Sequence, residues 1–467
     1  MQVATGVAAD AAPRQPILAI PAHTFMSRSL LGALVLLAGM TGSLQAQSAL
    51  TPTERRIADY VTAHADEAVG LLERVVNVNS GTGNLRGVRE VGAILAPELK
   101  GIGFDTRWIE MPDSMRRAGH LFAERNPGRA GRGKGKRLLL IGHLDTVFEN
   151  DSSAGPRFVR DGGTARGPGV NDMKGGDVVI VHALKALASV GALDGTTITV
   201  AFTGDEENPG QPLSISRRDL VAAARRSDVA LEFETAVRDS THEYATVARR
   251  SATGWTLRTG GVSAHSAGLF NDRVGSGAIF EAARILDEWH RELRGERYLT
   301  FNPGTILGGT TVSYDDVQAR GTAAGKTNVV AQHAIVTGDL RTISDAQLAS
   351  ARQRMRAIAE RHLPQTTAEV TFEEGYPAMS PTAANRALLD VLNAANRALG
   401  FAEQEALDPG LRGAADVSFA APYVGAALAG LGVHGSGSHT PAESVDLETM
   451  PRQIARAAIL IYRLTHP

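Results

Sequence analysis

The chain has 467 residues, of which 43% are hydrophobic and 21% charged, a balance typical of a globular protein with a sizeable core. Its formal charge of -2 gives no electrostatic reason to expect nucleic acid or anionic lipid as a partner. The sequence contains no cysteine, which excludes disulfides, thiolate metal ligands and cysteine nucleophiles. Any metal site must therefore be built from His, Asp and Glu side chains.

The first 46 residues divide into an upstream segment, 1–25, and a stretch, 26–46, that resembles a secretory signal peptide. A short basic segment at Met26 precedes an apolar run, Leu30 to Met40, and small residues ending at Ala46. This order is typical of a secretory signal peptide, and the apolar run is too short for an ordinary membrane-spanning helix. We expect translation to start at Met26 rather than Met1, with no stable membrane insertion after cleavage and a periplasmic or secreted mature protein. An uncleaved membrane anchor is the alternative.

The first part of the mature chain alternates between helix and strand. Apolar residues spaced three and four apart predict a helix from Pro52 to Val76 and another from Val88 to Gly101. The elements expected next are strand 104–110, a strand near Leu121, strand 138–141, helix 174–190, strand 196–203, a short helix ending at Arg226, and strand 229–233. Strands that alternate with helices predict parallel βαβ units, with helices on both faces of the sheet.

The order of elements changes near Tyr244. The elements expected there are strand 253–259, helix 275–292, strands 305–312 and 335–341, helix 346–362 and strand 368–374. This β-α-β-β-α-β order predicts an α+β, ferredoxin-like domain inserted into the larger α/β domain. The chain then resumes with helices 385–399 and 451–464. We place the larger domain at 52–247 and 380–467, and the inserted domain at 248–379.

The most informative stretch is LLLIGHLDTV, Leu138 to Val147. Its aliphatic run predicts a buried parallel strand, and ligands of open α/β sheets bind beyond the carboxyl ends of such strands. Alternation places His143 and Asp145 on one side, so the carboxylate can hold one imidazole nitrogen while the other faces a metal. A structural His-Asp hydrogen bond explains this stretch alone equally well.

Four further loops carry acidic or imidazole side chains just after a predicted strand or at a helix entry. They are GPGVND ending at Asp172, TGDEE with Glu206 and Glu207, EFE ending at Glu234, and GSHTP with His439. Taken singly, these residues fit ordinary roles as a helix cap, a solvated turn or a loop histidine. Together they supply imidazole nitrogens and carboxylate oxygens, which zinc binds, and one shared carboxylate can hold two ions.

These five loops occur in the order found in the zinc-dependent aminoacylase and carboxypeptidase family, which includes bacterial glutamate carboxypeptidase. The chain resembles that family over nearly all of its length after Thr53. The resemblance implies two Zn²⁺ ions per subunit, with Asp172 shared between them. The other ligands it implies are His143 and Glu234 for one ion, and Glu207 and His439 for the other.

The resemblance also implies how the site would work. Glu206 would stay free of the metals and act as general base, taking a proton from water and passing it to the departing amine. Asp145 would orient His143. In the family the peptide bond after the shared aspartate is cis, which here would be Asp172-Met173.

The inserted domain resembles the family's lid. His265 of GVSAHSAG would reach a neighbouring active site across a homodimer and stabilise the carbonyl oxyanion. Asn328 of KTN and Arg341 of DLR would bind the substrate's carbonyl and terminal carboxylate. A guanidinium fork suits a carboxylate, although an exposed salt bridge at a strand end is an alternative role for Arg341.

One lid position departs from the family's glutamate carboxypeptidases. They carry an arginine in a Gly-Arg-Pro-Ala stretch, whereas this chain has Tyr376 between Gly375 and Pro377. Tyrosine cannot supply that charge, so a strict preference for C-terminal glutamate or a folate-type substrate does not follow from the resemblance. Asp416, in a small-residue turn that resembles the family's, is given a structural role.

We therefore expect a two-domain, di-zinc hydrolase that cleaves an amide next to a free carboxylate in a peptide or N-acylamino acid. An aminopeptidase or an N-acyl or N-succinyl deacylase of the same family is the alternative within the enzyme class. An inactive homologue that serves as a binding module would be favoured by a missing ligand, and none is missing. No Gly-x-Ser-x-Gly stretch supports a serine hydrolase.

Overall fold

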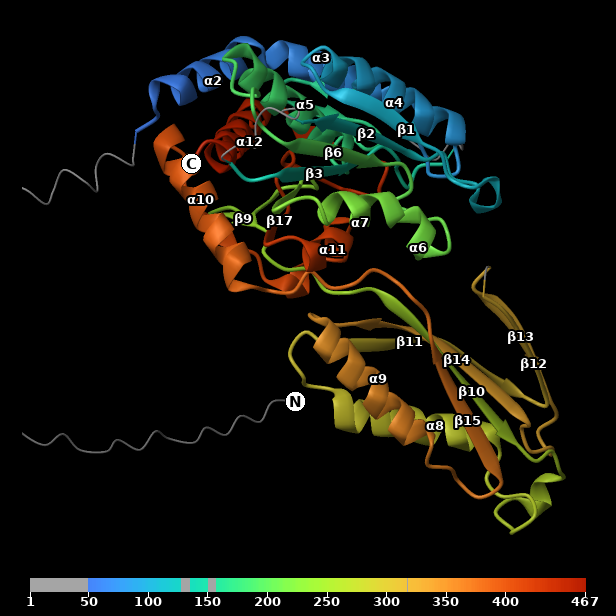
Figure 1. Cartoon of the computed structure of the whole chain (residues 1–467). Helices are drawn as coiled ribbons and strands as arrows, with labels where there is room; N and C mark the ends of the chain where they lie inside the picture. The colour runs from blue at the N-terminus through green and yellow to red at the C-terminus, as the bar shows by residue number, and fades with distance from the viewer. Residues whose placement is uncertain (1–48, 127–134, 150–156, 317) are drawn as a thin grey trace, which may run out of the picture. The chain divides into compact units, whose positions relative to one another are not determined.

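The computed structural model describes residues 49–126, 135–149, 157–316 and 318–467 (Figure 1). The predicted signal peptide lies outside these ranges. Among the described residues, none of the helices combines the length and the apolar character needed to cross a membrane.

Six strands form the central sheet, in the order β1-β2-β6-β3-β7-β17. The four strands from β6 to β17 are parallel neighbours, whereas β2 pairs antiparallel with both β6 and β1. The strands are β1 (Asp105–Ile109), β2 (His120–Arg125), β6 (Ile198–Thr203), β3 (Leu138–His143), β7 (Val229–Glu232) and β17 (Ala426–Leu428). The prediction of a mostly parallel sheet is confirmed, and the antiparallel edge arises because β1 and β2 are joined without a crossover helix.

Helices cover both faces of this sheet, as the side chains of β3 show, because they point alternately into two different cores. Leu138 and Leu140 belong to the larger core, whereas Leu139 and Ile141 belong to a second core on the other face. All of β3 is buried, as its continuous apolar run predicts. The larger core takes residues from α2 (Pro52–Ala63), α3 (Ala65–Val76), α4 (Leu85–Lys100), α5 (Lys174–Ser189), α10 (Ala383–Leu399) and α12 (Met450–Thr465). The second core takes residues from α7 (Arg218–Ala224) and α11 (Val417–Ala420).

The first predicted helix is divided in two. The chain leaves helical geometry at His64 (φ -116°, ψ 21°), which separates α2 from α3. The His64 ring stacks on Tyr60 with 3.8 Å between ring centroids, and its Nδ1 lies 2.8 Å from the Tyr60 carbonyl oxygen. This interaction with the last turn of α2 accompanies the break.

The inserted domain is built on a four-stranded antiparallel sheet, in the order β11-β14-β10-β15. Its strands are β10 (Thr253–Gly261), β11 (Thr300–Gly309), β14 (His333–Arg341) and β15 (Thr366–Phe372), and its helices are α8 (Ala278–Leu293) and α9 (Asp345–Ala359). Trp255 and Trp289 pack edge to face at 5.0 Å in a core shared by the sheet and both helices. The predicted ferredoxin-like order is confirmed.

A hairpin of β12 (Thr311–Asp315) and β13 (Arg320–Ala324) is added to this domain. The sequence predicted one strand over 305–312, but the chain turns after Gly309 instead. A Cβ at Gly309 would lie 2.5 Å from the carbonyl oxygen of Ala324, so the close approach of the hairpin requires glycine there.

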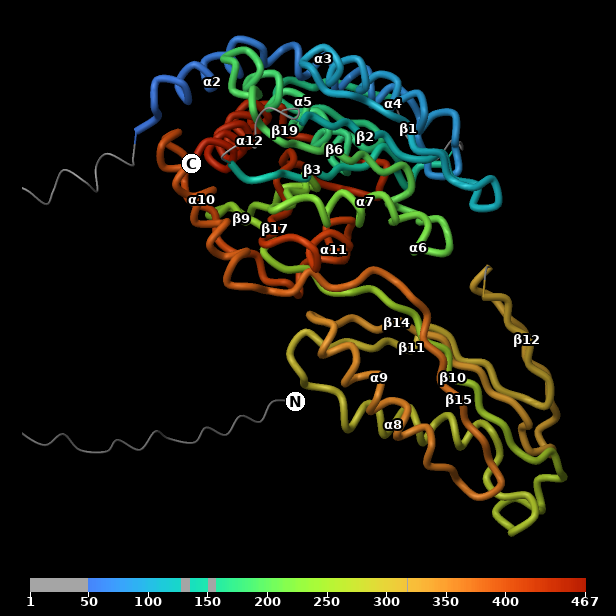
Figure 2. The backbone as a smooth tube through the Cα atoms, in the orientation of Figure 1, coloured from blue at the N-terminus to red at the C-terminus, as the bar shows by residue number. Residues whose placement is uncertain are grey.

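Two small sheets complete the larger domain and join segments far apart in the sequence (Figure 2). β19 pairs with β5, which brings the late loop between β18 and β19 beside the segment that leads to α5. The strands of these sheets are β16 (Gln404–Ala406), β9 (Glu243–Ala245), β8 (Val237–Arg238), β18 (Gly435–Ser436), β19 (Ser444–Asp446), β5 (Thr164–Arg166) and β4 (Val159–Asp161), and the remaining helix is α6 (Leu213–Ser216).

The start of α2 is tied to α12 by a buried carboxylate. Glu54 accepts hydrogen bonds from the Thr51 main-chain N–H at 2.8 Å and from Arg463 Nε at 2.6 Å. Burial alone would raise the pKa of Glu54, but these partners outweigh it and hold the pKa below its ordinary value.

We expect Glu54→Gln to lower the free energy of unfolding by roughly 1.5–3 kcal/mol at pH 7, because the charged hydrogen bond to Arg463 is lost. A carboxyl whose pKa is depressed by folding stabilises above its unfolded pKa and loses that contribution as the pH falls through the folded pKa. The deficit of Glu54→Gln should therefore shrink on acidification. Urea denaturation at several pH values measures it, with exposed Glu73→Gln as control; a deficit that grows in acid would contradict the assignment.

Candidate metal centre

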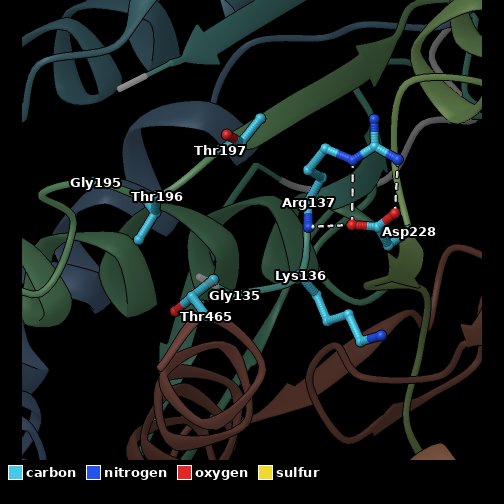
Figure 3. Close-up of a pocket in the computed structure, with 8 residues that line it drawn as sticks. All are labelled: Gly135, Lys136, Arg137, Gly195, Thr196, Thr197, Asp228 and Thr465. Atoms are coloured by element: carbon cyan, nitrogen blue, oxygen red, sulfur yellow. Dashed lines mark hydrogen bonds and ion pairs between the residues drawn. The ribbon is translucent and has the colours of Figure 1, made fainter. Parts of the chain in front are cut away.

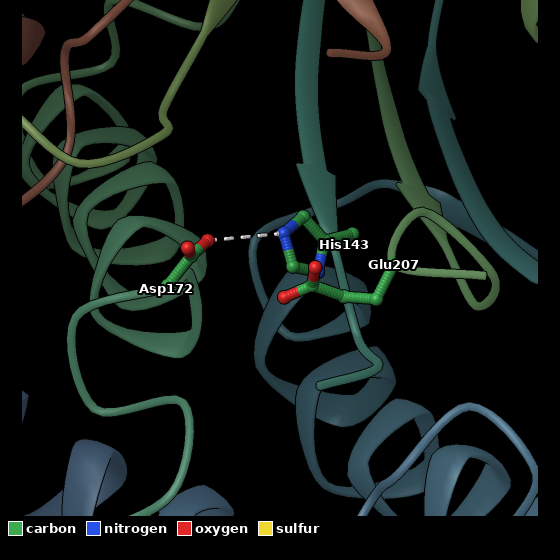
Figure 4. Close-up of side chains that lie close together, drawn as sticks. All are labelled: His143, Asp172 and Glu207. Atoms are coloured by element: carbon green, nitrogen blue, oxygen red, sulfur yellow. Dashed lines mark ion pairs between the residues drawn. The ribbon is translucent and has the colours of Figure 1, made fainter. Parts of the chain in front are cut away.

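The five predicted metal ligands converge at the carboxyl edge of the central sheet. His143 is the last residue of β3, and Glu207 and Glu234 lie just beyond the ends of β6 and β7. Asp172 lies two residues before α5, and His439 is in the loop between β18 and β19. Figure 4 shows three of these side chains pointing toward one another from separate elements.

The Asp172 carboxylate lies between the two imidazoles. Its Oδ1 is 3.5 Å from Nε2 of His143, and its Oδ2 is 3.2 Å from Nε2 of His439. The same His143 nitrogen is 3.5 Å from Oε1 of Glu234, and the same His439 nitrogen is 3.2 Å from Oε2 of Glu207. The cluster thus has two halves that share one carboxylate.

The donor atoms fit a pair of metal ions. Ligand atoms about 2.0–2.1 Å from a tetrahedral ion lie roughly 3.3 Å from one another, close to the separations in both halves. His143 Nε2 and Glu207 Oε1 are buried and lack hydrogen-bond partners in the part of the chain that the structure describes. Nitrogen and carboxylate oxygen donors without sulfur suit Zn²⁺, and a shared carboxylate is typical of two-metal sites.

The protonation equilibria of the cluster reflect its excess of negative charge. Burial and the neighbouring carboxylates raise the pKa of Glu206 and of Glu207. Burial opposes a charge on His143, but contacts with Asp145, Asp172 and Glu234 outweigh it and raise its pKa. Asp172 and Glu207 together raise the pKa of His439 to about 11. Bound cations would compensate the same carboxylates.

Asp145 fixes both His143 and the loop that carries Glu206. The Nδ1 of His143 is 3.0 Å from the main-chain oxygen of Asp145 and 3.5 Å from its carboxylate, so the carbonyl is the closer partner. The carboxylate instead accepts hydrogen bonds from the main-chain N–H groups of Glu206 and Glu207, at 3.0 and 3.1 Å, and from the hydroxyl of Thr82 at 2.6 Å. The predicted orienting contact is present, but mainly through the backbone.

Glu443 holds the loop that carries Asp172, and the sequence analysis missed it. Its carboxylate accepts hydrogen bonds from the main-chain N–H groups of Gly169, Asn171 and Asp172 at 2.8–2.9 Å. The Asp172-Met173 peptide bond is cis, as the resemblance implies. The available signal was a glutamate four residues after His439 in a segment with no helix to cap.

Two arginines, the buried Arg249 and the partly buried Arg412, flank Glu234 and were also missed. Arg249 forms an ion pair with Glu232 at 2.8 Å, and its guanidinium lies 3.9 Å from Glu234. Arg412 lies at the same 3.9 Å distance from Glu234 and donates to the carbonyl of Thr235. Burial and the charge of Arg249 lower the pKa of Arg412 to about 10. Both residues come from connecting segments, where no periodic pattern marks burial.

The loop of Glu206 is anchored by Arg217. This buried guanidinium donates to the carboxylates of Asp205 at 2.6 Å and of Asp416 at 2.7 Å. Asp416 also accepts from the Thr203 hydroxyl at 2.5 Å, in line with its predicted structural role. Tyr376 contacts the same arginine and lies in the segment between β15 and α10.

The three lid residues predicted to act on substrate make no hydrogen bond or ion pair with the cluster within the described chain. His265 and Asn328 are exposed neighbours, joined by a hydrogen bond of 2.9 Å from the Ser266 N–H to the Asn328 carbonyl. Arg341 pairs with Asp339 at 2.8 Å, the salt bridge considered as its alternative role.

A polar cavity of about 470 Å³ lies at the other edge of the central sheet (Figure 3). Lys136 and Arg137 precede β3, and Thr196 and Thr197 precede β6, so the cavity opens at the amino ends of these strands. Asp228, the one acidic residue among the described residues that line it, pairs with Arg137 at 2.6 Å. A single carboxylate that is already paired gives these residues no set of metal ligands, unlike the His143 cluster.

A cluster of histidines and carboxylates at the carboxyl ends of the strands of a mostly parallel sheet, with a ferredoxin-like domain inserted, defines a metal-dependent hydrolase. The chain belongs to peptidase family M20/M25/M40, whose sequence model matches residues 139–463, and it is a metallopeptidase.

Individual relatives agree with this assignment. The chain is 29% identical over 446 residues to carboxypeptidase G2 from Pseudomonas sp. (strain RS-16), covering 94% of this chain and 98% of the relative. An aminopeptidase structure from Bacillus cereus matches with a TM-score of 0.65 at 16% identity, covering 86% of this chain and 98% of that one. A dinuclear metal-binding peptidase from Bacillus subtilis matches with a TM-score of 0.57 at 13% identity, covering 86% and 99%. The expected family is confirmed, and these structures share its fold.

We expect Glu443→Gln to weaken the binding of a divalent metal, probed with Zn²⁺, about 10- to 100-fold, because an amide NH₂ would face main-chain N–H groups and displace the Asp172 loop. Competition with a chromophoric chelator measures the affinity. Glu448→Gln, an exposed change in the same segment, serves as control. Equal zinc affinities for Glu443→Gln and the wild type would show that this loop does not depend on Glu443.

Proposed function

We propose that the chain is a di-zinc hydrolase that releases an amino acid with a free carboxylate from a small peptide or N-acylamino acid. The observation that carries the proposal is the Asp172 carboxylate placed between His143 and His439, with Glu206 adjacent to a ligand residue. The similarity to carboxypeptidase G2 over 94% of the chain supports it.

Five side chains would hold the metals. Asp172 would be shared, with one oxygen toward each half of the cluster. His143 and Glu234 would complete one half, and Glu207 and His439 the other. When bound, the two ions would polarise the scissile carbonyl and make water a better nucleophile at neutral pH.

Glu206 would move the proton. Its pKa is raised by burial, so its carboxylate is a stronger base than an exposed glutamate. One of its carboxylate oxygens lies within 4.8 Å of ligand-type atoms of His143 and Glu234, so the base is next to the metal cluster. It would accept a proton from the attacking water and return it to the leaving nitrogen. Asp145 would keep Glu206 in place through the main-chain N–H bond of 3.0 Å.

Arg341 would recognise the substrate's free carboxylate. Its Nη1 lies 3.9 Å from the position that a Cβ on Gly413 would take, so the guanidinium reaches the loop that also contains Arg412. Arg412 and Arg249 place two further guanidinium groups beside Glu234, and Arg249 also pairs with Glu232. A carboxylate is the group that such a region would bind, with Asn328 directed to the carbonyl.

The lid would also form a homodimer, with His265 completing the partner's site. β11 is an edge strand of the lid sheet. Ile306 on this strand is 57% exposed, and Ile279 and Phe280 on α8 are 47% and 52% exposed. Ile306 pairs with Val336, a lid core residue, so it lies on the helix-bearing face of the sheet. An unpaired edge beside exposed apolar side chains suits a two-fold interface.

The signal-like segment ending at Ala46 would export the chain to the periplasm or beyond. Amino-terminal sequencing of the mature protein tests this; we expect a chain that starts at Gln47. A cytoplasmic protein that retains Met26 would contradict export.

The proposed reaction is tested with a panel of dipeptides and N-acylamino acids that differ in the C-terminal residue. We expect release of free amino acid that is lost on chelation and restored by Zn²⁺, and a ranking without strict glutamate preference because Tyr376 adds no charge. Release from amides that lack a free carboxylate, but carry a free amine or N-succinyl group, would favour the aminopeptidase or deacylase instead. No zinc-restorable release from folded protein would favour a binding module.

Within that assay, Glu206→Ala should keep both metals and lose about 10²- to 10⁴-fold in kcat, the usual contribution of a general base. Metal analysis of the purified variant separates lost chemistry from lost binding. Glu206→Gln, which preserves size, should behave alike. Undiminished hydrolysis by either variant would remove Glu206 from this role.

The proposed dimer predicts complementation between two inactive variants. His265→Ala and Glu206→Ala chains should each be weak alone, whereas coexpressed chains should regain activity because a mixed dimer contains one complete site. Light scattering gives the mass, and Ile306→Lys should yield monomers, with exposed Leu411→Lys on the larger domain as control. Failure of mixed dimers to exceed their parents would place His265 outside the partner's site.

A further inference from the structure

The Tyr376 hydroxyl lies where the connection between the two domains meets the loop of Glu206. It donates a hydrogen bond to the main-chain oxygen of Glu206 at 2.9 Å and accepts one from Nη2 of Arg217 at 2.8 Å. A phenol has a single proton to donate, so its donor capacity is used in these contacts.

Tyr376 is held on a paired connector. The chain leaves the larger domain before β10 and returns after β15, and these two segments hydrogen-bond to each other. The Ala252 N–H donates to the Tyr376 carbonyl at 2.9 Å, and Arg249 and Met379 exchange two main-chain bonds of 3.0 Å. The phenol ring packs edge to face on Phe419 at 4.8 Å. Its position is therefore determined by both domains.

Arg217 supports the same loop through a second main-chain oxygen. Its Nη2 donates to the main-chain oxygen of Asp205 at 3.0 Å as well as to Tyr376. Successive carbonyls of Asp205 and Glu206 are thus bound by one guanidinium and one phenol. The main-chain N–H of Glu206 is bound by Asp145. The peptide groups on both sides of the Glu206 side chain are fixed.

We propose that Tyr376 positions Glu206 by joining the loop of this base to the connector between the two domains. In this proposal Tyr376 does not contact the substrate. This rests on the proposed function. The glutamate carboxypeptidases that this chain resembles carry a charged arginine at this position. Here the hydroxyl of Tyr376 is already hydrogen-bonded to Arg217 and to the main-chain oxygen of Glu206.

The two roles predict different kinetics for Tyr376→Phe. Loss of the hydroxyl frees the Glu206 carbonyl and disturbs proton transfer, and a small misplacement of a catalytic group can cost about 10²-fold in rate. We expect kcat to fall about 10- to 100-fold by the same factor for every substrate of the panel, with KM changed less than about twofold. A substrate contact would instead change KM or the ranking of C-terminal residues.

A second readout does not depend on turnover. Hydrogen exchange followed by mass spectrometry should show faster exchange in peptides that cover 203–210 in the zinc-loaded Tyr376→Phe protein. Tyr423→Phe is the matched control, because Tyr423 is 42% exposed and its ring packs on Arg225. Zinc content should match the wild type within error.

The outcomes separate the two proposals. Unchanged exchange over 203–210 in Tyr376→Phe would overturn the positioning role whether or not the enzyme turns over any panel substrate. A substrate-selective rise in KM would overturn it in favour of a specificity role. Absence of zinc-restorable hydrolysis in the wild type, with faster exchange in the variant, would leave the link between connector and loop intact and reject the proposed reaction.

Discussion

The cost of burying several carboxylates at one edge of a sheet is the constraint on which the rest of this structure depends. Asp172, Glu206, Glu207 and Glu234 lie close enough that burial and mutual repulsion raise the pKa of Glu206 and Glu207. Metal cations would remove most of this cost, which is why two half-sites sharing Asp172 are chemically coherent. The fold offers the edge because β3, β6 and β7 end side by side.

Carboxylates outside the ligand set maintain the geometry. Asp145 accepts main-chain N–H groups from the loop after β6, and Glu443 accepts three from the loop before α5. In each case a buried carboxylate accepts hydrogen bonds from backbone donors, which also fix where the neighbouring ligand points. Arg217 fixes the loop of Glu206 as well, because it donates hydrogen bonds to both the carboxylate and the main-chain oxygen of Asp205. The ligands are therefore aligned through their backbones, so that the side chains stay free for metal and substrate.

The sequence predicted most of the helices and strands, and it located the residues of the cluster, because periodicity and motif order are local signals. It predicted the element boundaries less well where tertiary contacts decide them, as at the hairpin after Gly309 and the antiparallel edge of the main sheet. The break at His64 was also missed, although the contact that accompanies it, with Tyr60, is local. Glu443, Arg249 and Arg412 were missed for the same reason. Each lies in a connecting segment, and its importance comes from a backbone group or carboxylate distant in sequence.

At Tyr376 the position in the motif is retained, but the side chain takes a different role. As a sequence position it reads only as the loss of a positive charge from the lid. In the structure its hydroxyl joins Arg217 to the Glu206 carbonyl, so the position contributes to the proton-transfer loop instead. In the proposed function, the charge for a substrate carboxylate would come from Arg341 and the arginines near Gly413. Because the connector segments pair at Tyr376, the loop of the proposed base is joined by hydrogen bonds to the segments that lead into and out of the lid.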